Sequence, residues 1–211
     1  MDLQIRFFDA DTLKDPARFA EALARVAPER REKALRLRAA GAQRLSLAAG
    51  LLLAEALEAA GVDRAEMETA CGEQGKPYLP RRPDVQFSLS HSGTCAMCAL
   101  ADRPVGCDIQ LAEPLSLRLA QRFFTEAECA RIFARETEQA RQAMFYRIWT
   151  LKESFVKCLG LGLSLPLENF SVYPEAEGGI RLIQQSDPGS FLFTEPNAPE
   201  GYFAACCLRA E

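Results

Sequence analysis

Apolar and polar residues alternate in several short stretches of the chain, a pattern typical of β-strands with one buried face. The clearest example is 85–90, Val-Gln-Phe-Ser-Leu-Ser, and His91 lies just past its predicted end. The run 95–101 is continuously apolar, which predicts a fully buried strand. Further strands are predicted at 2–9, 105–109, 170–173, 180–183, 191–193 and 202–208.

Other segments show the longer apolar period of helices. Pro28 begins a basic helical segment, and 45–60 is a Leu- and Ala-rich helix that Gly61 ends. A third helix, 145–160, carries an apolar stripe, and Lys152 lies close to the centre of that stripe. A lysine in this position must reach solvent or meet an anion. Two more helices are predicted at 115–124 and 126–143.

The order of helices followed by strands occurs twice along the chain, which indicates an α+β fold. The small-residue strands 95–100 and 203–208 take comparable places in the two parts. We therefore predict two related halves, residues 1–106 and 107–211.

Composition limits the classes of partner. The formal charge is −4, which argues against a nucleic-acid-binding protein, because such proteins carry a basic excess. Residues 25–44 are nevertheless strongly basic, with seven Lys and Arg side chains against two Glu. A basic stripe of this length on an acidic chain suits a small polyanion.

The eight cysteines admit a disulfide, zinc or free-thiol interpretation. The first residues lack the apolar core of a signal peptide, and no run is long and apolar enough to span a membrane. We therefore expect a cytoplasmic protein with free thiols. Cys95 and Cys98 have the spacing of zinc ligands, but they lie in an apolar run without a second matching pair, which favours buried core residues.

Several residues are candidates for chemistry. Taken singly, Asp108 fits a turn residue, Glu153 and Lys157 fit a surface ion pair one helical turn apart, and His91 fits a half-buried imidazole. Taken together, Asp108 and Glu153 provide the carboxylates that a hard divalent cation requires. Phosphate contacts are available from His91, Lys76 and the basic stripe. This combination predicts Mg²⁺-assisted transfer from a pyrophosphate-bearing substrate.

The ordered motifs point to one family. They are Gly75-Lys76-Pro77, Phe87-Ser88-Leu89-Ser90-His91-Ser92-Gly93, Val105-Gly106-Cys107-Asp108-Ile109 and the run 145–157, which contains Trp149-Thr150-Leu151-Lys152-Glu153-Ser154-Phe155-Val156-Lys157. In this order the chain resembles the 4'-phosphopantetheinyl transferases of the surfactin-synthetase-activating type, over roughly residues 28–173 and the last strand.

The resemblance implies a pseudo-dimer of two similar α/β halves, with the active site in the cleft between them. It implies transfer of 4'-phosphopantetheine from coenzyme A to a serine of an apo acyl- or peptidyl-carrier protein, with Mg²⁺ required and 3',5'-ADP released. The first half would make the coenzyme A phosphate contacts, and the second would carry the metal and the catalytic helix. The carrier would serve fatty-acid, polyketide or nonribosomal-peptide synthesis. The family also makes a monomer plausible.

The resemblance assigns roles to individual residues. Asp108 and Glu153 would bind Mg²⁺, Glu153 would take the serine proton directly or through water, and Lys157 would stabilise charge on the transferring phosphate. His91 would act beside these groups at the pyrophosphate. The residues expected to contact coenzyme A are Arg30, Lys33, Arg44, Lys76, Ser90, His91 and Lys152.

One position departs from the family pattern. The family has Asp-x-Glu where this chain has Asp108-Ile109-Gln110, so the third metal ligand loses its charge. We hypothesise that the enzyme needs more Mg²⁺ than a relative with Glu. The alternatives are a catalytically weak or silent protein that binds coenzyme A or a carrier, and a zinc or thiol-redox protein. The segment 115–124, with Arg118 and Arg122, is either a carrier-docking surface or an ordinary amphipathic helix.

Overall fold

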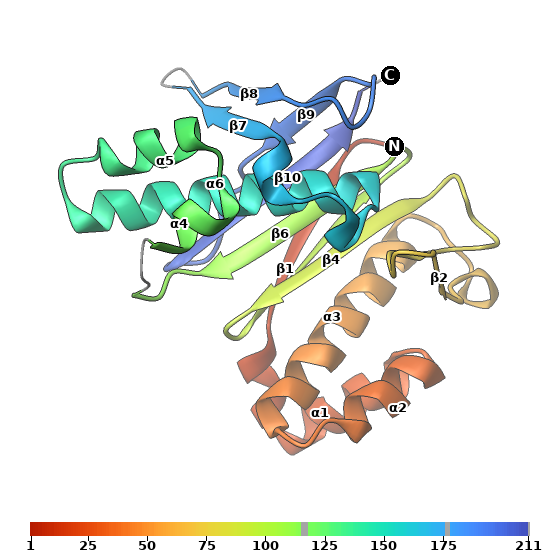
Figure 1. Ribbon diagram of the computed structural model, residues 1–211. Helices are drawn as coiled ribbons and strands as arrows, with labels where there is room; N and C mark the ends of the chain where they lie inside the picture. Colours follow the sequence, from red (N-terminus) through yellow and green to blue (C-terminus); the bar gives the residue numbers. More distant parts are fainter. Residues whose placement is uncertain (115–117, 176–177, 211) are drawn as a thin grey trace. The chain divides into compact units, whose positions relative to one another are not determined.

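The computed structural model describes residues 1–114, 118–175 and 178–210 (Figure 1). Helices and sheets are both present, which confirms the predicted α+β class. The chain divides into two compact units, Met1–Arg103 and Pro104–Glu211.

The sheet of the first unit has the order β1-β5-β4, with both pairs antiparallel. These strands are β1 (Gln4–Asp9), β5 (Cys95–Ala101) and β4 (Gln86–Ser92). β5 is buried along its whole length, as its continuous apolar sequence predicts. β4 extends further than its alternation suggests, because pairing with β5 continues to Ser92↔Cys95. His91 therefore lies within the strand rather than past its end.

Three helices accompany this sheet: α1 (Pro16–Arg25), α2 (Pro28–Arg36) and α3 (Ala40–Ala59). α3 carries most of the buried Leu and Ala side chains and packs against the sheet. α1 was not predicted from the sequence, although Asp15 caps its first turn and proline occupies its first position. A small hairpin follows, with β2 (Ala70–Cys71) and β3 (Pro77–Tyr78), and 3₁₀ turns lie at Ala10–Lys14 and Arg64–Glu66.

The main sheet of the second unit has the order β6-β10-β9, formed by β6 (Val105–Leu111), β10 (Tyr202–Arg209) and β9 (Phe191–Thr194). A separate antiparallel pair consists of β7 (Ser171–Pro174) and β8 (Ile180–Ile183). In both main sheets the last strand lies between the first and the penultimate one. This shared order agrees with the idea of two related halves, which remains a prediction.

The helices of the second unit are α4 (Arg118–Phe123), α5 (Glu126–Phe133) and α6 (Glu138–Leu159), and 3₁₀ turns follow at Gly162–Ser164 and Leu167–Asn169. Of the predicted helices 126–143 and 145–160, the start at Glu126 is confirmed and the end lies within one residue of Leu159, but the boundary between them is wrong. α5 ends at Phe133, and Thr137 caps a single long helix that runs to Leu159. Residues 115–117 of the predicted helix 115–124 lie outside the described residues.

α6 packs closely on β6 at Gly106. A Cβ atom at this position would lie 2.0 Å from the Ser154 carbonyl oxygen and 2.3 Å from the Cys158 backbone nitrogen. The glycine therefore allows the helix backbone to approach the strand, rather than making room for a ligand. This contact fixes how β6 and α6 present their polar side chains.

Candidate active site

Asp108 on β6 and Lys157 on α6 form an ion pair within the second unit. The Lys157 Nζ donates to the Asp108 Oδ1 at 2.7 Å, and the Gln110 Nε2 donates to the Asp108 Oδ2 at 3.1 Å. Asp108 is 2% exposed, whereas the side chain of Lys157 is 30% exposed. Both oxygens of the buried Asp108 carboxylate thus accept hydrogen bonds. Of the two paired side chains, only Lys157 is accessible from solvent.

Glu153 lies one turn before Lys157 on α6 and is half-buried. Burial raises the pKa of Glu153, repulsion from Asp108 raises it further, and Lys157 lowers it. For Lys157, burial lowers the pKa, but attraction from Asp108, followed by Cys107 and Glu153, outweighs burial and leaves it raised. Asp108 and Lys157 therefore act in opposite directions on the Glu153 carboxylate.

The oxygen atoms of Asp108, Glu153 and Gln110 are the candidate ligands for a bound Mg²⁺ ion. The described part of the chain holds no group of three or more His, Cys, Asp or Glu side chains placed to hold a metal. Asp108 and Glu153 are two carboxylates whose mutual repulsion a cation would relieve, and Gln110 adds an amide on the same strand. Oxygen ligands of this kind fit Mg²⁺ when phosphate oxygens and water complete the shell.

Lys152 is not part of this arrangement. Its side chain is fully buried, and its Nζ donates to both oxygens of Glu128, each at 2.7 Å, and to the Phe170 carbonyl at 2.5 Å. Burial lowers the pKa of Lys152 to about 8, although Glu128 raises it. The anion that the sequence required is thus Glu128 of the same unit. The expected contact between Lys152 and coenzyme A is wrong, because all three ammonium protons are engaged inside the protein.

Replacing this ammonium is expected to destabilise the protein. Lys152→Met leaves the buried Glu128 carboxylate without a cation, which costs about 3 kcal/mol. Urea unfolding should show this loss, and Lys14→Met, at an exposed lysine, should change the midpoint little. The double variant Lys152→Met/Glu128→Leu should recover part of the stability. Equal stability of Lys152→Met and the wild type would contradict the role of the pair.

In the first unit, a cavity of about 660 Å³ lies between α2, α3 and the hairpin β2–β3. Arg30, Lys33, Gly75 and Pro77 line it, so Lys76 stands between two lining residues. Gly50 of α3 also lines the cavity, and a Cβ there would lie 2.6 Å from the Arg30 Cγ. The stem of Arg30 therefore rests on Gly50, a relationship that the sequence did not reveal.

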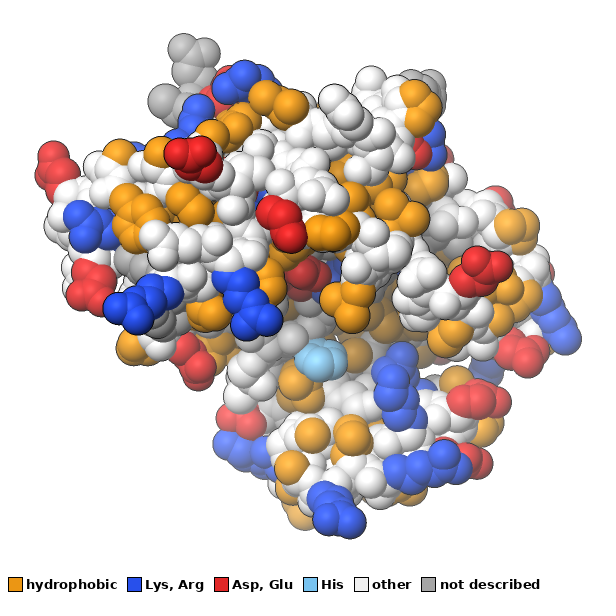
Figure 2. Space-filling model, in the orientation of Figure 1, with side chains coloured by type: hydrophobic (Ala, Val, Ile, Leu, Met, Phe, Trp, Pro, Cys, Tyr) orange, Lys and Arg blue, Asp and Glu red, His pale blue; other side chains and the backbone are white. Residues whose placement is uncertain are grey.

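The remaining predicted contacts lie elsewhere in the first unit. Arg44 is not among the cavity-lining residues; its Nη2 lies 3.8 Å from the Asp11 Oδ1. Ser90 and His91 are neighbours on β4 and point to opposite faces of the sheet. Ser90 is buried, whereas His91, the pale blue side chain in Figure 2, is exposed. Arg30, Lys33 and the loop that contains Lys76 thus surround one cavity, and Arg44 lies outside it.

The cysteines bear on the expectation of free thiols. None of the eight cysteines, all of which lie among the described residues, forms a disulfide. Cys95 and Cys98 are buried on β5, in agreement with core positions. Among the described residues, no helix is long and apolar enough to cross a membrane.

Comparisons with known proteins identify the class. The family model described as the 4'-phosphopantetheinyl transferase superfamily matches residues 104–207. A 4'-phosphopantetheinyl transferase of Bacillus subtilis is 36% identical over 186 residues, covering 88% of this chain and 83% of the relative. The 4'-phosphopantetheinyl transferase Sfp of Bacillus subtilis strain 168 is 35% identical over 184 residues, with coverage of 86% and 81%. The chain therefore belongs to the 4'-phosphopantetheinyl transferases.

The chain also resembles a solved structure over about half of its length. The holo-[acyl-carrier-protein] synthase of Thermotoga maritima matches with a TM-score of 0.44 and 22% identity, covering 51% of this chain and 63% of that one.

Proposed function

We propose that this enzyme transfers 4'-phosphopantetheine from coenzyme A to a serine hydroxyl of an apo acyl- or peptidyl-carrier protein, with Mg²⁺ required. The arrangement of Asp108, Glu153 and Lys157 carries the proposal, because it combines two carboxylates with an ammonium on rigid elements of a chain that belongs to this family. A bond forms between the serine Oγ and the phosphorus of phosphopantetheine, and the bond to the second phosphate breaks. 3',5'-ADP leaves, and the serine proton is removed.

Each group of the second unit has a distinct role in this reaction. Asp108 and Glu153 would hold Mg²⁺, with Gln110 as a weaker third ligand, and the bound ion would supply charge stabilisation to the phosphates. Glu153, directly or through water, takes the serine proton. Lys157 stabilises negative charge on the transferring phosphate and the leaving group.

The first unit binds the nucleotide part of coenzyme A. Arg30 and Lys33 line a cavity large enough for a small organic ligand and contact its 3'-phosphate, whereas Arg44 lies outside this cavity. Lys76 and His91 hold the pyrophosphate, whereas the Ser90 side chain is buried and points to the opposite face of β4. Burial lowers the pKa of Arg30. Because water reaches this guanidinium poorly, its attraction to a bound phosphate is only weakly screened.

Intact-mass spectrometry of apo carrier proteins tests the reaction. Carriers are incubated with the enzyme, coenzyme A and Mg²⁺, and a mass gain of one phosphopantetheine is expected. The gain should disappear without coenzyme A and with Glu153→Ala. Binding of coenzyme A without any gain on several carriers would overturn the proposal and favour a silent binding protein, for which Gln110 is the specific observation.

The Gln110 departure predicts a change in Mg²⁺ requirement. Gln110→Glu adds a third carboxylate beside Asp108, so the Mg²⁺ concentration at half-maximal rate should fall about tenfold. Titration of Mg²⁺ against rate measures it, and Gln121→Glu, an exposed position on α4, controls for the added charge. Identical half-saturation of wild type and Gln110→Glu would sink the hypothesis.

The cavity predicts a separate effect on substrate binding. Arg30→Gln loses charge-assisted hydrogen bonds to a phosphate, so the KM for coenzyme A should rise about tenfold with little change in kcat. Gly50→Ala should have a similar effect, because its Cβ displaces the Arg30 stem. Arg18→Gln removes an exposed arginine of α1 and is the matched control. A drop in kcat with an unchanged KM would place Arg30 outside the binding contacts.

The carrier surface and the oligomeric state stay predictions. Arg118 and Arg122 belong to α4, and the Arg122 guanidinium lies 5.2 Å from the centre of the Phe123 ring. An acidic carrier helix could pair with this helix. A monomer in the cytoplasm remains the expectation.

A further inference from the structure

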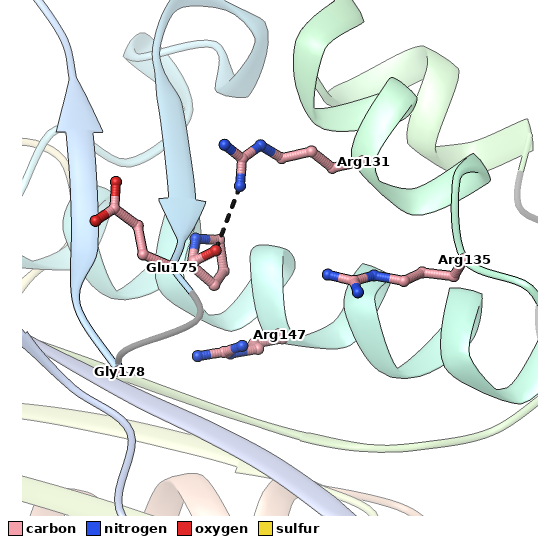
Figure 3. Close-up of a pocket in the computed structure, with 6 residues that line it drawn as sticks. Arg131, Arg135, Arg147, Glu175 and Gly178 are labelled. Carbon is pink, nitrogen blue, oxygen red and sulfur yellow. Dashed lines mark hydrogen bonds between the residues drawn. The ribbon is translucent and has the colours of Figure 1, made fainter.

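A second recess, of about 550 Å³, lies in the second unit away from the carboxylates (Figure 3). Three arginines line it: Arg131 of α5, Arg135 just after α5, and Arg147 of α6. Figure 3 shows their side chains extending into the recess from two neighbouring helical segments, toward the chain that follows β7. The motifs used for the transferase reaction do not include these residues.

Two of the three guanidinium groups are held in place by protein contacts. The Arg131 Nη1 donates to the Pro174 carbonyl at 3.3 Å, and its guanidinium lies 4.6 Å from the centre of the Tyr173 ring. Arg147 donates through Nε and Nη2 to the two oxygens of Glu195, each at 2.6 Å. These contacts use one edge of each fork and leave further N–H donors on the other. The donors are thus positioned before any ligand arrives.

Among residues 118–175 and 178–210, the carboxylates near the recess do not balance its three arginines. Glu195 is engaged by Arg147, and Glu175 lies 3.4 Å from the Nε of Arg181. In that part of the chain, neither Arg131 nor Arg135 forms an ion pair with a carboxylate; Arg131 donates to the Pro174 carbonyl instead. Positive charge therefore gathers in one recess of a chain whose formal charge is −4, and such a recess attracts anions.

The recess is also separate from the catalytic groups. Arg147 and Glu153 are six residues apart on α6, which amounts to roughly 9 Å along the axis and about 240° around it. The two side chains therefore leave the helix on different faces. An anion bound at Arg147 would not occupy the place of a substrate at Glu153.

We propose that this recess binds a small polyanion that carries phosphate or carboxylate groups. Arg131 and Arg135 provide the main contacts, and the outer edge of Arg147 provides a third. Guanidinium groups match both kinds of oxyanion, because two parallel N–H donors meet two oxygens. The recess is concave although open to solvent, and its three cations suit a small ligand better than a long polyanion or a membrane surface, which need a broad basic face.

Isothermal titration of the full chain with pyrophosphate and, separately, with citrate tests the site and distinguishes the two chemistries. Arg135→Gln should weaken binding about tenfold, and Arg135 is exposed, so the fold should be unaffected. Glu195→Gln should strengthen binding about threefold, because it removes a competing negative charge beside Arg147. Arg18→Gln, in the first unit, should change nothing.

The same titrations identify the outcomes that overturn the proposal. Pyrophosphate is also a fragment of the proposed substrate, so Lys33→Gln is included. Binding that is lost in Lys33→Gln but kept in Arg135→Gln would place the anion in the other cavity. Equal loss in Arg135→Gln and Arg18→Gln would show non-specific attraction. Absence of binding for both probes would also overturn the proposal. Tighter binding of pyrophosphate would identify a phosphate-bearing ligand, and tighter binding of citrate would identify a carboxylate-bearing one.

Discussion

Gly106→Ala is expected to destabilise the protein by about 4 kcal/mol or more, with loss of activity. The added Cβ would lie 2.0 Å from the Ser154 carbonyl oxygen and 2.3 Å from the Cys158 nitrogen, and both atoms belong to the backbone of α6. Backbone atoms inside a helix cannot move aside as the end of a flexible side chain can. The helix must shift away from β6, and the shift separates Glu153 and Lys157 from Asp108.

Urea unfolding followed by circular dichroism measures the loss, and activity of any folded fraction measures the displacement. Gly179→Ala, in the same unit, is the matched control, because its Cβ would meet only the Glu175 Oε2 at an ordinary 3.8 Å. A Gly106→Ala protein with wild-type stability and rate would show that β6 and α6 do not need this close approach.

The strands were predictable where burial alone decides the pattern. β5 begins and ends as its apolar run predicts, because every side chain of that strand is buried. The helices of the second unit were not. The start of α5 after its capping residue Thr125 was predicted, but the boundary between α5 and α6 depends on Thr137, which accepts from the Ala140 nitrogen and begins α6. Polar residues on both sides of Thr137 continue the helical pattern and concealed this cap.

The site was predictable within each segment but not across segments. The spacing of Glu153 and Lys157 on one helix follows from the sequence. The ion pair between Lys157 and Asp108 depends on a contact between residues 49 positions apart, which local periodicity does not encode. The partner of Lys152 was missed for the same reason: Glu128 lies 24 residues earlier and has the pattern of a capping residue. The support of Arg30 by Gly50 and the three-arginine recess likewise arise only from tertiary packing.

Glu153→Gln is expected to lower kcat by roughly 10²–10⁴-fold, the range that loss of a general base produces. The substitution keeps the shape of the side chain and removes its charge, so both proton abstraction and metal binding suffer. The stability of the folded protein should not decrease. Burial and repulsion from Asp108 both disfavour the Glu153 charge, as its raised pKa shows, so a neutral amide is tolerated or slightly stabilising.

Single-turnover transfer to an apo carrier measures the rate, and thermal unfolding measures stability on the same preparation. Glu138→Gln, at the exposed first turn of α6, is the matched control and should leave the rate unchanged. Retained coenzyme A binding in Glu153→Gln separates a chemical defect from a binding defect, because the cavity of the first unit is untouched. A rate within threefold of wild type would remove Glu153 from the chemistry and direct the search for a base to His91.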